Sequence, residues 1–390
     1  MSATKIMLVG GGSGGHLTPL LAVAAAIKLH NPETVVVHIG QKNENLHDVV
    51  GGVDIDQSYS ITAGKFRRYH GKSFIAHLLD LKTMVLNIRD VFRFIIGTYQ
   101  AWRLLGRVKP DSIMLKGGFV CVPVGYAARL RHIPYLTHDS DAVPGLANRM
   151  TAKHAVYNTT ALPSDLYPYD SAKTIQVGIP LRAEFVEVTA NDMKSAKQKL
   201  SICPDSPVVF SVGGGLGAQR VNKALVSAAP ELLDQNKNLI IIHVTGKKLY
   251  NETKQLYQSL LNEDQMKCIK IIDFSPGLFQ YSAAADVILT RGGATNIAEF
   301  AAQAKPCVVV PAPQLTGGQQ LHNAKVLNDA KAAVIVYEDE LSSLTDVLTE
   351  LLHAPASERE SLGQKLHALT VYDSANKLAN LLQEIVKVEV

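Results

Sequence analysis

A glycine-rich loop near the amino terminus ends in a histidine placed where it could do chemistry. Residues Gly10 to Gly15 fit the pattern G-x-G-x-x-G, between an apolar run that ends at Val9 and a stretch with helical spacing. Backbone amides of such a loop can approach a phosphate or another oxygen-rich group. His16 falls in the first turn of the predicted helix, where the helix dipole disfavours imidazolium and keeps the ring neutral. A neutral imidazole can act as a base, although a histidine that only caps or packs the helix explains the sequence equally well.

The same pattern occurs in dinucleotide-binding loops, which need an acidic residue about 20 positions further on to hold a ribose hydroxyl. At that position the chain reads VVVHIGQKN (35–43), and the corresponding stretch of the second half reads IIIHVTGKK (240–248). Neither stretch contains the acid. The sequence therefore disfavours NAD, and we expect no obligatory cofactor.

A second group of residues combines a cation, a glycine pair and an acid. Arg291 precedes Gly292 and Gly293, which open a predicted helix, and Glu299 follows within that helix. Glu299 lies among alanines on an otherwise apolar helix, where an ionised carboxylate is costly unless it has a partner. A ligand hydroxyl is one such partner, and a salt bridge to a neighbouring lysine or arginine is the alternative.

Three side-chain amides follow the next predicted strand, Cys307 to Val310. They are Gln319, Gln320 and Asn323, and they come after a glycine-containing loop. An amide offers both donors and acceptors, which suits the recognition of sugar hydroxyls. Composition alone explains them as a solvated helix start.

The residues HDSD (138–141) end another predicted strand. Asp139 and Asp141 form a D-x-D arrangement that could hold a divalent metal on a diphosphate. The same kind of spacing arises by chance at VDID (53–56) and EDE (338–340), so we predict no metal site. The four cysteines form no CxxC pair and are expected to be reduced core thiols.

The charge of the chain is unevenly distributed. Residues 61–110 contain ten Lys or Arg residues against two Asp, so this segment carries +8 while the whole chain carries +4. Aromatic residues are interspersed among these charges, and much of the segment has helical spacing. Such a surface suits anionic lipid headgroups, and we expect residues 65–109 to associate peripherally with the inner membrane surface. A packed helix with a solvated basic face is the alternative, and no motif for nucleic acid is visible.

The elements that must position these residues follow a repeated order. Short β-branched runs are each followed by glycine and an alanine-rich helical stretch, which is typical of βαβ units in a parallel sheet. MLVGGGSGGH (7–16) resembles VFSVGGGLGAQ (209–219), and residues 114–138 resemble residues 288–312. We therefore predict an α/β protein with two Rossmann-like domains, residues 1–185 and 186–390, that face each other across a cleft. The last helix can cross back to the first domain.

Size and composition agree with this prediction. A chain of 390 residues is long for one core, and 47% hydrophobic with 19% charged residues is ordinary for a globular enzyme. The amino terminus lacks the apolar region of a signal peptide. No apolar run approaches the roughly 18 residues of a bilayer span, so we expect a cytoplasmic protein.

Five blocks in the same order resemble the MurG-type N-acetylglucosaminyltransferases, which complete lipid II in bacterial peptidoglycan synthesis. The last block is the most specific. The blocks are GGGSGGHLTPLLAVA (10–24), GGFVCVPVGYAA (117–128), VGIPLR (177–182), GGGLGAQRVN (213–222) and RGGATNIAEFAAQAKPCVVVPAP (291–313) followed by GGQQLHNA (317–324).

The resemblance implies a GT-B fold and an inverting transfer without an obligatory metal. GlcNAc would move from UDP-GlcNAc to the C4 hydroxyl of undecaprenyl-diphosphate-linked MurNAc-peptide, at the cytoplasmic face of the cell membrane. Glu299 would hold the ribose hydroxyls, Gln319 and Gln320 the GlcNAc hydroxyls, and Phe274 the uracil. The other substrate-binding positions that it implies are Ser13, Gly14, Gly15, Arg182, Gly214, Gly215, Arg291 and Gly293.

A sugar hydroxyl is a poor nucleophile at neutral pH, so its attack on the anomeric carbon benefits from a base. His16 is the first candidate, and Asp139 or Asp141 is the second. Main-chain amides at helix starts and Arg182 could stabilise the charge that develops on the leaving UDP.

The chain departs from the family pattern on the acceptor side. The family usually has HEQN where residues 138–141 read HDSD, threonine at Ser13, and Ser-Gln at Gly215 and Leu216. Three other functions therefore stay open. They are transfer to another lipid acceptor, UDP-GlcNAc epimerisation, and nucleotide-sugar binding without catalysis.

Overall fold

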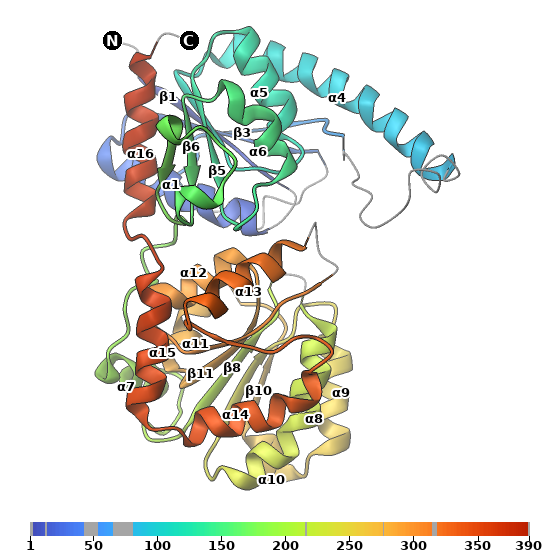
Figure 1. Ribbon diagram of the computed structural model, residues 1–390, viewed down its shortest axis with the longest axis vertical. Helices are drawn as coiled ribbons and strands as arrows, with labels where there is room; N and C mark the ends of the chain where they lie inside the picture. Colours follow the sequence, from blue (N-terminus) through green and yellow to red (C-terminus); the bar gives the residue numbers. More distant parts are fainter. Residues whose placement is uncertain are drawn as a thin grey trace. The chain divides into compact units, whose positions relative to one another are not determined.

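The computed structural model describes residues 3–11, 14–42, 54–64, 81–214, 217–275, 277–313 and 318–388, without the side chains of residues 14–16 and 81–85. The chain forms two compact units, shown in Figure 1. The first unit combines Met1–Arg182 with Val371–Val390, and the second is Ala183–Thr370. The sequence placed the boundary at residue 185 with a last helix able to cross back, and the structure divides the chain after Arg182 and assigns the last 20 residues to the first unit.

The first unit is built on a seven-stranded sheet in the order β3-β2-β1-β4-β5-β6-β7. All its strand pairs are parallel. Its central strands are short apolar runs that are buried on both faces, as parallel strands covered by helices require. The strands are β1 (Lys5–Val9), β2 (Val35–Gln41), β3 (Gln57–Ile61), β4 (Ser112–Leu115), β5 (Tyr135–Asp139), β6 (Tyr157–Thr160) and β7 (Thr174–Gln176).

Helices cover both faces of this sheet. Ile6 and Leu8 of β1 pack with Leu20 and Leu378 on one face, whereas Met7 and Val9 belong to a separate cluster on the other. The helix that carries Leu378 lies against the first helix of the chain, so the end of the chain helps to build the first core. The helices are α1 (Gly14–His30), α4 (Leu81–Val108), α5 (Cys121–Leu130), α6 (Leu146–Thr151) and α16 (Ser374–Glu384).

The second unit has a six-stranded sheet in the order β10-β9-β8-β11-β12-β13, again with parallel pairs. Val209 and Leu289 face one hydrophobic cluster, and Phe210 and Ile288 face another. The strands are β8 (Val208–Val212), β9 (Ile240–Val244), β10 (Ile269–Ile272), β11 (Val287–Arg291), β12 (Cys307–Val310) and β13 (Val334–Ile335). The helices are α7 (Ala190–Lys199), α8 (Gln219–Gln235), α9 (Tyr250–Leu260), α10 (Glu263–Lys267), α11 (Leu278–Ala284), α12 (Ala294–Ala302), α13 (Gln319–Asp329), α14 (Leu344–His353) and α15 (Ala356–Ala368).

The two sheets have the same switch in strand order. β1 lies between β2 and β4, and β8 lies between β9 and β11 in the corresponding way. In open parallel sheets, ligands bind outside the carboxyl ends of the strands at such a switch point. The glycine loops after β1, β4, β8 and β11 all lie at these ends, so the fold places the predicted site residues where ligands are expected.

Candidate active site

In the second unit, the two glycines between β11 and α12 have different surroundings. Gly292 packs against a neighbouring helix, whereas Gly293 borders open space. A Cβ atom at Gly292 would lie 2.9 Å from the main-chain oxygen of Gln320, so α13 packs directly on this glycine. A Cβ atom at Gly293 would meet no atom within 4 Å, and the φ of Gly293 is an ordinary −76°. Neither crowding nor backbone conformation requires glycine at position 293. Its small size therefore leaves room in front of the first turn of α12.

The amides at the start of α13 tie the neighbouring loops together. Asn323 Nδ2 donates to the main-chain oxygen of Gly292 at 2.9 Å, and Gln320 Oε1 accepts from the amide of Ala312 at 2.9 Å. Gln319 is the half-buried first residue of the helix. The sequence explained these amides as a solvated helix start or as sugar contacts, and the structure adds that two of them position the loops after β11 and β12.

Glu299 and Arg291 are both held inside the second unit. Glu299 is 5% exposed on the second turn of α12. Arg291 Nη2 lies 2.6 Å from Glu338 Oε1, and Arg291 Nη1 donates to the main-chain oxygen of Val310 at 3.3 Å. Arg220 contacts the other oxygen of Glu338, also at 2.6 Å. Arg291 is thus paired with a carboxylate that it shares with Arg220, and the sequence alone did not reveal Glu338 as its partner.

The loops after β8 and β10 supply the other predicted positions. Gly214 has φ +88°, and a Cβ atom there would meet nothing within 4 Å. Gly215 lies outside the described residues. Phe274 follows β10 with 46% of its surface exposed, and Lys247 Nζ lies 5.1 Å from the centre of its ring. An exposed ring beside a cation can stack on a flat heterocycle.

In the first unit, the glycine loop after β1 is anchored by a buried histidine. His38 Nε2 lies 3.1 Å from the main-chain oxygen of Gly10, and burial lowers the pKa of His38, which keeps the ring neutral. A Cβ atom at Gly118 would come 2.7 Å from the main-chain oxygen of Gly11, so the loops after β1 and β4 touch. Gly14 and Gly15 begin α1. Ser13 and the side chain of His16 lie outside the described part of the chain.

The two acids after β5 differ in their surroundings. Asp139 is 4% exposed, and its oxygens accept from the amide of Gly145 at 3.1 Å and the hydroxyl of Tyr169 at 2.7 Å. Burial raises the pKa of Asp139. Asp141 is half-buried, and its main-chain oxygen accepts from the hydroxyl of Tyr167 at 3.0 Å. Asp139 thus supports the loop, and Asp141 is the more exposed of the two acids.

A lysine that the sequence interpretation missed lies beside these acids. Lys116 follows β4, is 2% exposed, and donates from Nζ to Ser140 Oγ at 2.7 Å. The internal repeat could have identified Lys116, because this lysine precedes a glycine pair in the first half as Arg291 does in the second. Arg182, the remaining predicted residue, is half-buried at the end of the main segment of the first unit.

Two further features are absent from the described ranges. No helix there combines the length and apolar character that a bilayer span needs. No three His, Cys, Asp or Glu side chains in those ranges come together as a metal ion would require.

The family of the chain follows from comparison with known proteins. Residues 6–157 match the glycosyltransferase family 28 N-terminal domain, and residues 208–378 match the C-terminal domain of the same family. Curated relatives carry the name UDP-N-acetylglucosamine–N-acetylmuramyl-(pentapeptide) pyrophosphoryl-undecaprenol N-acetylglucosamine transferase. The protein of Natranaerobius thermophilus is 30% identical over 87% of this chain and 88% of its own length. That of Clostridium novyi is 30% identical over 99% of this chain and 100% of its own length.

Solved structures agree on the fold. MurG of Acinetobacter baumannii matches with a TM-score of 0.72 at 24% identity, over 98% of this chain and 99% of that chain. A UDP-GlcNAc 2-epimerase from Neisseria meningitidis matches with a TM-score of 0.62 at 14% identity, over 98% and 100%. Both sheets and the residues at their carboxyl ends therefore define an enzyme of the glycosyltransferase class with the GT-B fold, as the sequence predicted.

Within that class, the chain belongs to glycosyltransferase family 28, together with the MurG-type N-acetylglucosaminyltransferases.

Proposed function

We propose that the protein transfers GlcNAc from UDP-GlcNAc to the C4 hydroxyl of undecaprenyl-diphosphate-linked MurNAc-peptide, which converts lipid I into lipid II. One observation carries this proposal. Relatives named for this transferase activity match at 30% identity over nearly the whole chain. The RGGATNIAEF segment at residues 291–300 gives the second unit the features of a donor site.

We infer that the second unit binds the donor. Glu299 is a buried carboxylate that can accept from ribose hydroxyls, and Phe274 is an exposed ring that can cover uracil. Gln319 and Gln320 begin α13 and can reach the sugar hydroxyls. The open position at Gly293 lets the diphosphate approach the amides at the start of α12, where the helix dipole favours an anion.

The chemical step is a displacement at the anomeric carbon with inversion. His16 removes the proton of the acceptor hydroxyl, and Asp141 is the second candidate for that role. Negative charge grows on the leaving diphosphate, where helix-start amides and Arg182 stabilise it. The chemistry of this step needs no resident cofactor.

The helix α4 supports a peripheral membrane association of the first unit, at the cytoplasmic face of the cell membrane. Figure 1 shows this helix running along α5 and extending past it. Arg89, Arg93, Arg103 and Arg107 add positive charge to it. A row of apolar side chains, here called the α4 stripe, is at least 41% exposed at each position: Ile88, Val91, Phe92, Ile95, Ile96, Tyr99 and Trp102. Residues 65–80 of the predicted membrane segment lie outside the described residues.

An apolar stripe beside arginines is the pattern of a helix that lies on an anionic bilayer. Replacement of Phe92 and Ile95 by serine removes two of its most exposed side chains and should weaken binding to anionic vesicles about tenfold or more. A matched control replaces Leu29 and Leu260, which are exposed elsewhere, and should bind as the wild type does. Equal vesicle binding by both double variants would refute the membrane proposal.

The transfer itself is tested by measuring UDP release from a panel of UDP-sugars, with and without a lipid-linked MurNAc acceptor. The proposal expects release only when UDP-GlcNAc and the acceptor are both present. Release of UDP from UDP-GlcNAc and water alone would indicate a hydrolysing epimerase, and conversion of UDP-GlcNAc into its epimer without net UDP release would indicate a non-hydrolysing one. Preference for another lipid acceptor would indicate a different transferase. Binding of UDP without any release would indicate a non-catalytic protein.

A further inference from the structure

We propose that Lys116 is a positioning residue of the transfer reaction, which fixes Ser140 and thereby the Asp141 carboxylate where the first unit receives the acceptor. This inference rests on the proposed function. It concerns the residue directly before the glycine pair that follows β4, and this residue lies outside the donor site. Four observations carry it: the place of Lys116 in the sheet, its single close contact, the acids that face it, and the contrast with other buried lysines.

The backbone places Lys116 at the centre of the sheet. Its amide donates to the main-chain oxygen of Val9 at 2.9 Å, directly beyond the carboxyl end of β1. The next residues, Gly117 and Gly118, form the loop that touches the glycine loop after β1. The side chain therefore starts from the switch point of the strand order, the place where an open parallel sheet binds ligands.

The side chain of Lys116 reaches the loop after β5. Nζ donates to Ser140 Oγ at 2.7 Å, while the neighbouring residue Asp139 is held by Gly145 and Tyr169. Ser140 lies directly between Asp139 and Asp141 in the chain. The contact from Lys116 to Ser140, together with the hydrogen bond from Tyr167 to the main-chain oxygen of Asp141, thus holds the backbone that carries the Asp141 carboxylate.

Titratable groups from three elements face the ammonium. Asp139 at the end of β5 and Asp141 in the loop that follows attract it, and Cys121 lies on α5 and His138 on β5. Burial lowers the pKa of Lys116 to about 8, against the attraction of the two acids. Burial, together with the Lys116 charge, also lowers the pKa of His138 well below its ordinary value, so that ring is neutral. The cation is therefore held at this edge by acids that lie beyond direct contact.

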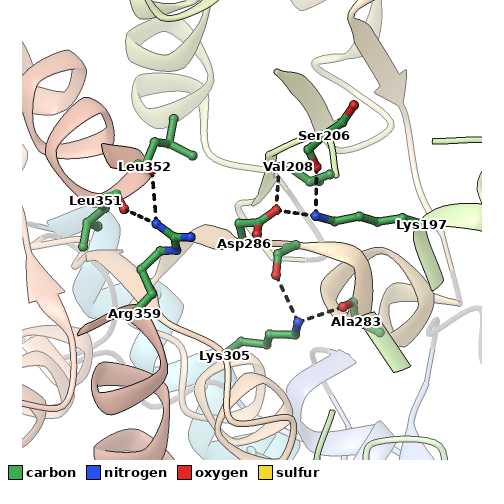
Figure 2. A network of polar contacts seen from close by, with 10 residues as sticks. Lys197, Ser206, Val208, Ala283, Asp286, Lys305, Leu351, Leu352 and Arg359 are labelled. Atoms are coloured by element: carbon green, nitrogen blue, oxygen red, sulfur yellow. Dashed lines mark hydrogen bonds and ion pairs between the residues drawn. The ribbon is translucent and has the colours of Figure 1, made fainter. Parts of the chain in front are cut away.

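Two buried lysines of the second unit each make two close contacts to oxygen atoms of the protein, as Figure 2 shows. Lys197 Nζ contacts both Asp286 and the main-chain oxygen of Ser206 at 2.8 Å. Lys305 Nζ donates to the main-chain oxygens of Ala283 at 2.7 Å and Ala285 at 3.0 Å. These contacts hold the segments that enter β8 and β11. Lys116 instead makes one close contact, to a neutral hydroxyl, among the residues that the structure describes.

A buried ammonium is costly when its hydrogen-bonding capacity is not filled. A methionine of similar length would pack in the same space without that cost. The lysine is retained at the ligand-binding edge, with its charge directed at a loop that carries an acid. A role in setting that loop for the acceptor accounts for this arrangement, whereas a role in core stability does not.

The test compares Lys116→Met with the wild type, using UDP-GlcNAc and a lipid-linked MurNAc acceptor. We expect kcat/KM for the acceptor to fall about 100-fold, the size expected when a reacting group is misplaced by about 1 Å. The dissociation constant for UDP should stay within about twofold, because the donor residues lie in the other unit. Ser140→Ala leaves the lysine in place and should reproduce part of the loss if the hydrogen bond positions the loop.

The pH profile separates positioning from a structural role. The wild type should lose kcat/KM above about pH 8, where the ammonium gives up its proton, as the pKa of about 8 requires. Lys116→Arg keeps the charge at every working pH, so this basic limb should move to higher pH. Lys116→Met removes a positive charge near Asp139 and Asp141, so the pKa values of these two acids should rise. The acid limb of the kcat/KM profile should therefore also move to higher pH.

Lys305→Met is the matched control, because it removes a buried lysine whose ammonium has two main-chain partners away from the sheet edge. It should lower thermal stability without changing the pH profile. Folded Lys116→Met and Ser140→Ala variants with acceptor kcat/KM within about twofold of the wild type would overturn the inference. If the wild type transfers nothing to the acceptor, the proposed function fails first and the inference falls with it.

Discussion

The cations Lys116 and Arg291 occupy corresponding places in the two units but have different surroundings. Both stand at the end of a central strand and before a glycine pair, in β4–α5 and in β11–α12. Arg291 has a carboxylate at 2.6 Å, whereas Lys116 has a hydroxyl at 2.7 Å. The same backbone motif thus ends in a cation paired with a carboxylate in one unit and in a cation without a close carboxylate among the described residues in the other.

The difference indicates that the ligand-binding edges of the two sheets have different functions. The edge of the second unit is organised by an ion pair, by amides and by glycines that leave space, which suits the binding of a neutral sugar and a diphosphate. The edge of the first unit gathers ionisable groups around Lys116 and Asp141. We therefore expect substitutions in the first unit to act on turnover, and substitutions in the second to act on donor affinity or stability.

The largest expected effect belongs to His16 in the first unit. His16→Ala should lower kcat about 1,000-fold, because the acceptor hydroxyl loses its base. The dissociation constant for UDP, measured by calorimetry, should stay within a few fold. Turnover near that of the wild type would remove His16 as the base, and Asp141→Asn would then be the next variant to measure.

Arg291→Met tests the claim that the cation of the second unit is structural. It leaves Glu338 with only its exposed partner Arg220, so the free energy of unfolding should fall by about 3 kcal/mol in denaturant titrations. Arg220→Met removes the 61% exposed partner of the same carboxylate and should cost less than about 1 kcal/mol. Equal losses in the two variants would contradict the claim that the Arg291 contact is the stronger one.

Glu299→Ala tests donor binding by the second unit. The KM for UDP-GlcNAc should rise about 30-fold, since a charged hydrogen-bond acceptor is removed from the nucleoside. Initial rates at varied donor and saturating acceptor give the constant. The KM for the acceptor serves as the internal control and should not change. An unchanged donor KM would exclude Glu299 from the donor site.

The smallest expected effect tests the open position next to Arg291. A methyl group at Gly293 meets no protein atom, so Gly293→Ala should keep the stability of the wild type and raise the KM for UDP-GlcNAc about fivefold. Gly292→Ala is the contrasting variant, because its methyl group would press on Gln320 and lower thermal stability. A donor KM that Gly293→Ala leaves unchanged would show that the ligand does not approach this turn.

The fold was largely predictable from the sequence where the strands are buried. Continuous apolar runs such as 6–9, 208–212 and 307–310 match β1, β8 and β12 within one residue at each end. No apolar run marks the edge strands β3 (QSYSI) and β7 (TIQ). Such strands are short and only partly covered, so their hydrogen-bonded neighbours define them rather than their composition.

Some of the site residues could likewise be predicted from the sequence, and others could not. The glycine loops, Glu299 and the amides of α13 could be found in the chain, because a phosphate-binding turn needs glycine at fixed spacing and an isolated acid on an apolar helix needs a partner. Two pairings could not be predicted from the chain. Arg291 and Glu338 are 47 residues apart in the sequence, and Lys116 and Ser140 are 24 residues apart.

The sequence by itself therefore determined the order of strands, glycine loops and helices, and with it the edge of each sheet where ligands bind. Only the tertiary structure decided which of the two equivalent cations is paired directly with a carboxylate. Local spacing controls which backbone turns can form, but the net charge at a site depends on groups that the fold brings within a few ångströms. For Lys116 and Arg291, those groups come from other strands and loops.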